Sequence, residues 1–357
     1  MKKLFLFNFM FLLCLSAIGK PTGTYKYIVE GFDWGAGVNK VILQLTDTTS
    51  KVNASDYQVF ASRKSTAGPI NDTQNMRDVV GAYVSDEQGN RVKTGKNITL
   101  VLSVSPTAPI TSPIQYFRGK GNVWVDYAMT VMHTKSQQIW DTPTGKIMPL
   151  VDQYDLTGKY TFNEKLTMSY ATYTPKTTKE KSPLVIWLHG GGEGGTDPTI
   201  PLLGNKAANY ASEGIQAIFD GAYVLSPQCP GAWMHNTQGV GTQGKDNDIY
   251  NEGLMALIKD YVKANPKIDA NRIYVGGCSN GGYMALKLIL LYPDYFAAGY
   301  ISALAYRSEY IADADIQKIK HVPIWFVHSK DDMTTIPKLT VEPVFDRLRT
   351  AGAKNVH

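Results

Sequence analysis

The sequence predicts a two-part fold, an all-β sandwich followed by an α/β domain with a mostly parallel sheet and helices on both faces. Two patterns carry this prediction. Residues 20–148 hold short runs of β-forming residues separated by turns, with no helical period. In residues 149–357, apolar strand-like runs alternate with helical segments. A chain of 357 residues is long enough for two such domains, each with a core of its own.

The front part has the regular spacing of short strands that is typical of an antiparallel sandwich of immunoglobulin type. Its one histidine, His133, has no glycine loop or acidic cluster of catalytic spacing beside it. We therefore expect this part to pack against the second part, to position it or to bind a ligand. Its aromatic residues could stack on sugars, although packing in the core is their more usual role. The expected strands are 25–32, 40–45, 57–62, 79–84, 98–104 and 123–129.

A polar, turn-rich passage at 141–145 marks the expected boundary between the two parts. Beyond it, the apolar run 183–188 is typical of a strand buried on both faces of a parallel sheet. Ligands of such sheets bind at the carboxyl ends of the strands. The expected strands are 160–162, 166–173, 183–188, 222–226, 272–276, 297–302 and 323–328, and the expected helices are 205–219, 249–264, the segment after Ser279, 308–319 and 341–350.

The candidate nucleophile is Ser279, in the segment 277–281 (GCSNG), which fits the pattern G-x-S-x-G. Small residues on both sides of the serine allow a strand to turn sharply into a helix, which leaves the hydroxyl at the tip of the turn. The pattern alone is weak, because 32 glycines make a chance match common. A strand before it, a helix after it and a second glycine-rich turn at 188–195 favour a nucleophile elbow.

Attack by a serine places negative charge on a carbonyl oxygen, which backbone N–H groups must stabilise. Asn280, directly after the serine, is expected to supply one such donor. The second is expected from the turn that follows the strand 183–188, with Gly191 as the candidate because glycine lets the backbone approach a substrate closely.

The serine also needs a base and an acid that orients the base. Asp332 is our candidate acid, with Asp331 as the alternative, because both follow the strand 323–328. Among the six histidines, only His357 comes after these acids. Residues 353–357 are expected to begin a further strand, whereas the base belongs on the loop that leaves it, so His357 would lie roughly 15 Å from the site. We therefore expect the catalytic histidine beyond residue 357 and the α/β domain to be incomplete at its C-terminus.

Residues 1–19 have two lysines, an apolar stretch and a small-residue exit, the layout of a secretory signal peptide. The apolar stretch is short for a membrane span, so we expect cleavage, a secreted or periplasmic protein and no stable membrane insertion. Removal of this segment lowers the net charge from +5 to +3. A net charge this small does not indicate a protein that binds nucleic acid. Cys229 and Cys278 are expected on strands separated by a third, too far apart to bridge, so both thiols should be free.

The second part resembles the secreted α/β-hydrolase esterases grouped with predicted peptidases of prolyl-oligopeptidase type. The resemblance covers about residue 160 to the end, and the front part is similar to the immunoglobulin-like domain found on some of these esterases. It implies hydrolysis of carboxylic esters through an acyl-serine intermediate, with no metal or other cofactor. It rests on the motifs LHGGGEGG (188–195), SPQCPGAW (226–233), DANRIYVGGCSNGG (269–282) and HSKDD (328–332).

The leading hypothesis is a secreted serine esterase that acts on small-molecule or plant-derived esters. A serine peptidase would use the same machinery, and no acidic pocket for a basic side chain can be identified to separate the two. A binding protein with an inactive hydrolase domain is the alternative from another class. Trp233, in the long polar segment 231–247, is a candidate for lining the acyl pocket. Acyl specificity and oligomeric state cannot be read from the sequence.

Overall fold

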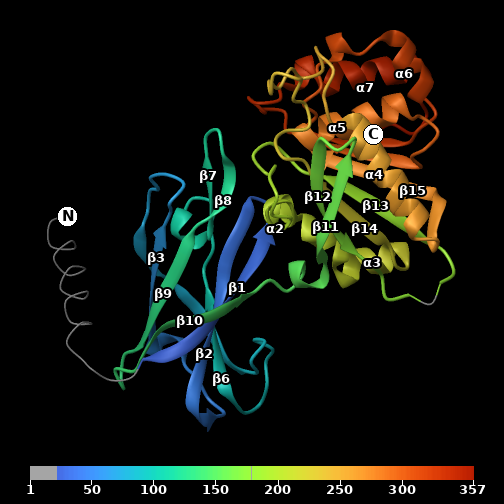
Figure 1. The fold of residues 1–357 in the computed structure, drawn as a ribbon. Helices are drawn as coiled ribbons and strands as arrows, with labels where there is room; N and C mark the ends of the chain where they lie inside the picture. The colour runs from blue at the N-terminus through green and yellow to red at the C-terminus, as the bar shows by residue number, and fades with distance from the viewer. Residues whose placement is uncertain (1–21, 178) are drawn as a thin grey trace.

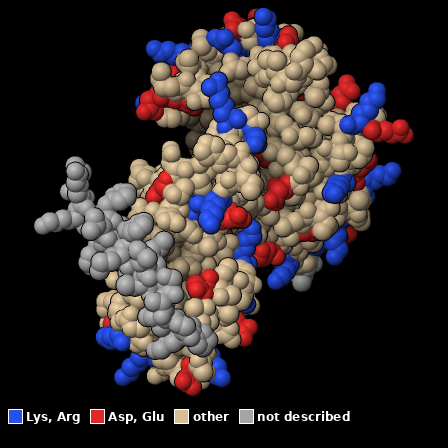
Figure 2. Space-filling view, turned by 60° about the vertical axis from the view of Figure 1, so that its left-hand side comes forward, with Lys and Arg blue, Asp and Glu red and all other residues tan. Residues whose placement is uncertain are grey.

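The computed structural model describes residues 22–177 and 179–357 and shows two domains side by side (Figure 1). The expected signal peptide, residues 1–19, lies outside the described residues. No helix among the described residues is long and apolar enough to cross a membrane. Acidic and basic side chains are interspersed over the face drawn in Figure 2, so this face presents no large field of one sign to a charged partner.

The N-terminal domain is the expected β-sandwich, built on an eight-stranded sheet with the order β4-β3-β9-β10-β1-β2-β6-β5. Buried side chains such as Val59 and Val131, from one half of this order, pack in one cluster with Val41 and Leu100 from the other half, so the sheet folds over on itself. Its strands are β1 (Gly23–Phe32), β2 (Gly35–Thr49), β3 (Tyr57–Lys64), β4 (Gln74–Arg77), β5 (Val79–Ser85), β6 (Gly95–Leu102), β9 (Asp126–His133) and β10 (Ile139–Ile147).

Three regions of this domain differ from the sequence-based expectation, and the first is β4, which no expected strand covers. The expected strand 123–129 is divided between β9 and a separate hairpin, which is formed by β7 (Ile114–Phe117) and β8 (Gly121–Trp124). The polar passage at 141–145 is part of β10, which runs parallel to β1. Beyond Trp140 this strand has no partner on its β9 side within the described residues, and Pro143 is tolerated in a strand because that edge needs no N–H donor.

The second domain has a seven-stranded sheet with the order β11-β12-β14-β13-β15-β16-β17, of which the last five strands are mutually parallel. It is the expected mostly parallel sheet, and every expected strand is present. The strands are β11 (Asp155–Phe162), β12 (Leu166–Tyr173), β13 (Ser182–Leu188), β14 (Tyr223–Gln228), β15 (Ile268–Cys278), β16 (Ala298–Ser302) and β17 (Ile324–Val327).

Helices cover both faces of this sheet, as predicted. Leu184 and Ile186 pack with α4 and α5 on one face, whereas Trp187 contacts Tyr210 on the other. The expected helix 205–219 is broken into η4 and α3, because Ser212 between them has an extended backbone, with φ −66° and ψ 149°, and forms the N-cap of α3. The helices are α2 (Thr199–Leu203), α3 (Glu213–Phe219), α4 (Asn251–Ala264), α5 (Asn280–Leu291), α6 (Asp313–Ile319) and α7 (Val341–Thr350), and the 3-10 turns are η1 (Ala54–Asp56), η2 (Pro109–Thr111), η3 (Val151–Gln153), η4 (Gly204–Ala211), η5 (Ser308–Tyr310) and η6 (Pro337–Leu339).

The two domains share a hydrophobic cluster. Leu202, Leu203 and Ala208, from α2 and η4, are buried together with Val29 of β1 and Val38 of β2. Each domain therefore covers apolar surface that the other would otherwise expose to water. This packing fixes the β-sandwich beside the turns that follow β13.

Candidate active site

The carboxyl ends of four neighbouring strands stop at the same level of the sheet. Leu188 of β13 pairs with Gly277 of β15, and Cys278 pairs with Ser302 of β16, which in turn pairs with Val327 of β17. Because parallel strands are about 4.8 Å apart, the turns that follow them form one row. The glycine-rich turn, the candidate nucleophile and the candidate acids all leave the sheet in this row.

Ser279 occupies a sharp, strained turn between β15 and α5. Its φ of 55° and ψ of −109° lie outside the regions favoured by L-residues. The Ser279 N–H donates to the Ser302 carbonyl at 2.8 Å, which fixes the turn against β16. A Cβ on Gly281 would lie 2.0 Å from the Leu188 carbonyl oxygen, so the start of α5 packs directly on the end of β13. The side chain of Ser279 remains partly exposed, as a nucleophile requires.

The two candidate oxyanion donors lie on either side of this serine. Asn280 is the first residue of α5, so its N–H has no partner within the helix. Gly191 is exposed, and a Cβ placed on it would meet no atom within 4 Å. The neighbouring Gly190 N–H is already bonded to Glu193 Oε2 at 2.8 Å, whereas no hydrogen bond occupies the Gly191 N–H among the described residues. The Gly191 N–H is therefore open to a substrate, as is the neighbouring Gly192 N–H, which also has no partner among the described residues.

Two buried ionisable groups hold the turn from beneath. Burial raises the pKa of Glu193 to about 7, and its carboxyl accepts the Gly190 N–H. Burial lowers the pKa of His189 to about 4, so this ring is neutral near pH 7. His189 Nδ1 donates to the Gly190 carbonyl at 2.8 Å, and Nε2 accepts the Cys229 N–H at 3.3 Å. Both ring nitrogens are thereby used in positioning, and His189 is unsuited to act as a base.

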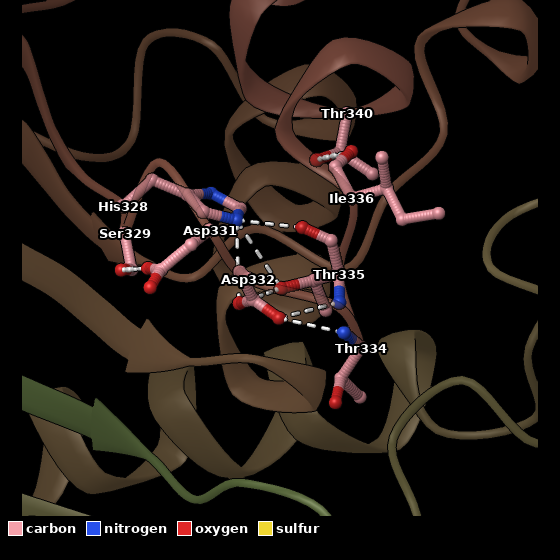
Figure 3. Close-up of polar contacts among 8 residues, drawn as sticks. All are labelled: His328, Ser329, Asp331, Asp332, Thr334, Thr335, Ile336 and Thr340. Atoms are coloured by element: carbon pink, nitrogen blue, oxygen red, sulfur yellow. Dashed lines mark hydrogen bonds and ion pairs between the residues drawn. The ribbon is translucent and has the colours of Figure 1, made fainter.

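Asp332 lies in a network of donors on the loop after β17 (Figure 3). Its Oδ1 accepts the N–H groups of Thr334 and Thr335 at 2.8 and 2.9 Å, and its Oδ2 accepts the Thr335 hydroxyl at 2.5 Å. Burial opposes the charge on this carboxylate, but the hydrogen bonds from Thr335 and Thr334 and the nearby His328 together lower its pKa. The carboxylate is therefore held rigidly in its charged form.

The alternative acid, Asp331, points to a different partner. Its carboxylate accepts a hydrogen bond from Ser329, and this contact lowers its pKa in a fully exposed position (Figure 3). Asp332 is less exposed, with 18% of its side chain accessible. The structure therefore brings Asp332, rather than Asp331, into an ordered network of the kind that orients a base.

His328, which the sequence placed only at the end of a strand, contacts this acid. Its Nε2 lies 2.7 Å from the Thr335 carbonyl oxygen and 3.4 Å from Asp332 Oδ2. Because a carbonyl can only accept, Nε2 carries the proton. The other ring nitrogen, Nδ1, is buried and has no hydrogen-bond partner in the described part of the chain. His328 therefore helps to position Asp332.

His357 pairs with β17, the last strand of the sheet. Its N–H donates to the Ile324 carbonyl at 3.1 Å, and its ring lies 5.3 Å from the ring of Trp325. No histidine within 22–177 or 179–357 forms a hydrogen bond with Ser279. The structure thus places Ser279, the turn with Gly191 and Asp332 after the carboxyl ends of β13, β15 and β17, and no histidine among the described residues is bonded to the serine.

The expectation for Trp233 was wrong. Its side chain is fully buried, with ring centroids 5.0 Å from His189 and 5.9 Å from Tyr250, so it does not line an open pocket. The polar segment around it gave no sign that this residue turns inward and supports the His189 ring. Cys229 and Cys278 are both free, as expected, because their strands are separated by β13.

Comparison with known proteins identifies both domains. Residues 24–146 match the esterase Ig-like N-terminal domain, and residues 172–350, half of the chain, match the phospholipase/carboxylesterase model. The chain belongs to the phospholipase/carboxylesterase family. The predicted resemblance to α/β-hydrolase esterases with an immunoglobulin-like domain is thereby confirmed.

Two relatives of this carboxylesterase-family chain illustrate the similarity. It is 33% identical over 129 residues to feruloyl esterase B of Neurospora crassa, an alignment that covers 36% of the chain and 41% of the relative. The chain thus spans about two fifths of that curated relative. Its fold is similar to that of a thermostable esterase of known structure, with a TM-score of 0.78 at 22% identity, over 93% of this chain and 89% of the other.

Proposed function

We propose that this member of the carboxylesterase family is a secreted serine esterase with Ser279 as the nucleophile. The observation that carries the proposal is the position of Ser279, strained and partly exposed, beside a turn whose Gly191 amide is open. Strained backbone at an exposed serine of this kind is typical of functional sites. Export through residues 1–19 and the absence of nucleic-acid partners are parts of the same proposal.

In the proposed reaction, the Ser279 oxygen attacks the ester carbonyl carbon while a histidine base takes its proton. The carbonyl oxygen becomes an oxyanion and accepts the Gly191 and Asn280 N–H groups. The tetrahedral intermediate collapses, the alcohol leaves with the proton from the base, and an acyl-serine remains. Water then attacks this acyl group, gives a proton to the base, and releases the carboxylic acid and the serine hydroxyl.

Asp332 is proposed to orient the base. Asp332 follows β17 and Ser279 follows β15, and β16 lies between these two strands. The two segments therefore leave the sheet about two strand spacings, or roughly 10 Å, apart. One imidazole with a hydrogen bond at each end can bridge the gap that remains between a serine and an aspartate side chain. Such a ring would find Asp332 ordered and charged by the contacts from Thr334 and Thr335.

The proposed substrates are small-molecule or plant-derived carboxylic esters. Support comes from the family of the chain and from the relative named feruloyl esterase B. An ester of a hydroxycinnamic acid with a small alcohol is thus the first substrate to test, beside p-nitrophenyl acetate as a general ester.

The test uses the product of the complete gene and its Ser279→Ala variant, which keeps the fold because alanine occupies the same space without the hydroxyl. Hydrolysis of methyl ferulate and p-nitrophenyl acetate is compared with that of a peptide anilide. The proposal predicts ester turnover that falls by at least roughly 10³-fold in the variant. Faster cleavage of the anilide would favour a peptidase, and folded protein without turnover would favour a binding role for the sandwich.

A further inference from the structure

The β7–β8 hairpin of the Ig-like domain contacts the turn that carries the candidate oxyanion donor. The Asn122 N–H donates to the Gly192 carbonyl at 2.6 Å. Gly192 directly follows Gly191, so a hydrogen bond from the N-terminal domain ends one residue from the open amide. The hairpin rises from the sandwich on the side of the α/β domain (Figure 1).

The two backbones approach each other as closely as glycines permit. A Cβ on Gly121 would lie 2.5 Å from the Gly192 carbonyl oxygen, and a Cβ on Gly192 would lie 2.8 Å from the ring of Tyr116. Both glycines also have positive φ values, 79° at Gly121 and 88° at Gly192. The contact therefore depends on the absence of side chains at both positions.

The hairpin is anchored on both sides of this contact. Toward the sandwich, the buried Arg63 donates to Gln115 Oε1 at 3.0 Å, which ties β7 to β3. Toward the α/β domain, Trp124 Nε1 donates to Thr199 Oγ1 at 3.0 Å, which ties β8 to α2. The hairpin is thus held at both ends, because neither strand can move without breaking one of these partly buried hydrogen bonds.

These contacts clamp the turn on either side of Gly191. The Glu193 carboxyl holds the Gly190 N–H, and the hairpin holds the Gly192 carbonyl. The Gly191 N–H between them is left without a partner among the described residues. A preorganised donor of this kind needs no rearrangement when the oxyanion forms, which is the source of its catalytic effect.

We propose that the β7–β8 hairpin is a positioning element for ester hydrolysis, and that Gly121, Asn122 and Tyr116 set the Gly191 amide through their contacts with Gly192. This inference rests on the serine mechanism proposed above. It assigns the Ig-like domain a part in catalysis, in addition to its packing against the α/β domain.

The test compares Gly121→Ala with Gly119→Ala. Both positions have nearly the same positive φ, 79° and 81°, so both variants carry the same backbone strain. Only Gly121→Ala introduces a Cβ against Gly192, because a Cβ on Gly119 would meet no atom within 4 Å. We expect Gly121→Ala to lower kcat for p-nitrophenyl acetate by roughly 10- to 100-fold with little change in KM, and Gly119→Ala to match the unmodified enzyme.

Hydrogen exchange of the peptide that contains Gly190–Glu193 gives a readout independent of turnover. Faster exchange in Gly121→Ala, but not in Gly119→Ala, together with the lower kcat, supports the proposal. Unchanged exchange, or equal kcat in the two variants, overturns it. If the unmodified enzyme has no turnover that depends on Ser279, the serine mechanism itself fails, and the inference fails with it.

Tyr116 provides a second pair of variants. Its ring packs on Gly192, whereas its hydroxyl makes no hydrogen bond among the described residues. Tyr116→Ala should therefore lower kcat, and Tyr116→Phe should restore it. A Tyr116→Phe variant as impaired as Tyr116→Ala would contradict a role for ring packing.

Discussion

The backbone of Gly281 lies against the last residues of β13. A Cβ there would be 2.0 Å from the Leu188 carbonyl oxygen and 2.6 Å from that of His189, and backbone atoms cannot rotate away. We expect Gly281→Ala to destabilise the fold by roughly 3 kcal/mol or more. The exposed helical Gly214, where a Cβ would meet nothing within 4 Å, is the control, and Gly214→Ala should stabilise by up to about 1 kcal/mol. Denaturant unfolding of both variants checks this, and equal stability of the two would contradict it.

Glu193 makes stability depend on pH. Because burial raises its pKa from 4.5 to about 7, its contribution to stability is complete below about pH 4.5 and is lost as the pH rises to about 7. Glu193→Gln keeps an oxygen that accepts the Gly190 N–H but cannot ionise. The difference in Tm between this variant and the unmodified protein should therefore be several degrees larger, in favour of the variant, at pH 8 than at pH 5. The exposed Glu180→Gln is the control, and a difference that does not change with pH would argue against this account.

At the scale of single residues, the sequence was informative where a motif fixes the backbone. The spacing around Ser279 predicted the strained turn that the structure shows. The burial of Trp233 and the role of Glu193 could not be predicted in this way, because both depend on which neighbours the fold brings together. An acidic residue inside a glycine-rich turn was the one available signal for Glu193.

At the scale of elements, alternating strands and helices made the α/β domain predictable. Strand β10 was missed because its proline and polar residues resemble a turn, and they are tolerated only because most of the strand lacks a partner on one side. The break between η4 and α3 was missed because it is made by the extended backbone of Ser212, an N-cap serine with no glycine or proline at the break itself.

Helix α7 is tied to the start of α6 by one side chain. Arg347 donates to the Ser308 carbonyl at 2.8 Å, the Ile311 carbonyl at 2.6 Å and the Asp313 carboxylate at 2.7 Å. Arg347→Met removes these donors while keeping the apolar stem, and we expect a loss of about 2 kcal/mol because two carbonyls lose a charged partner. The exposed Arg349→Met should cost less than about 0.5 kcal/mol. A thermal unfolding comparison in which the two variants agree would refute this role.

At the scale of the whole molecule, the shared cluster that joins Val29 to Leu202 and Leu203 couples the two domains. We expect a single calorimetric unfolding transition, because neither domain can unfold without exposing apolar surface of the other. Two resolved transitions would show that the domains are stable independently. The contact between the hairpin and Gly192 belongs to the same scale, and no local sequence pattern could have predicted it.

Covalent labelling shows whether Ser279 is the nucleophile. The product of the complete gene is treated with a fluorophosphonate, digested and analysed by mass spectrometry. We expect a single modified serine, Ser279, and no labelling in the folded Ser279→Ala variant. Label on another residue, or equal labelling of the variant, would show that Ser279 is not the nucleophile.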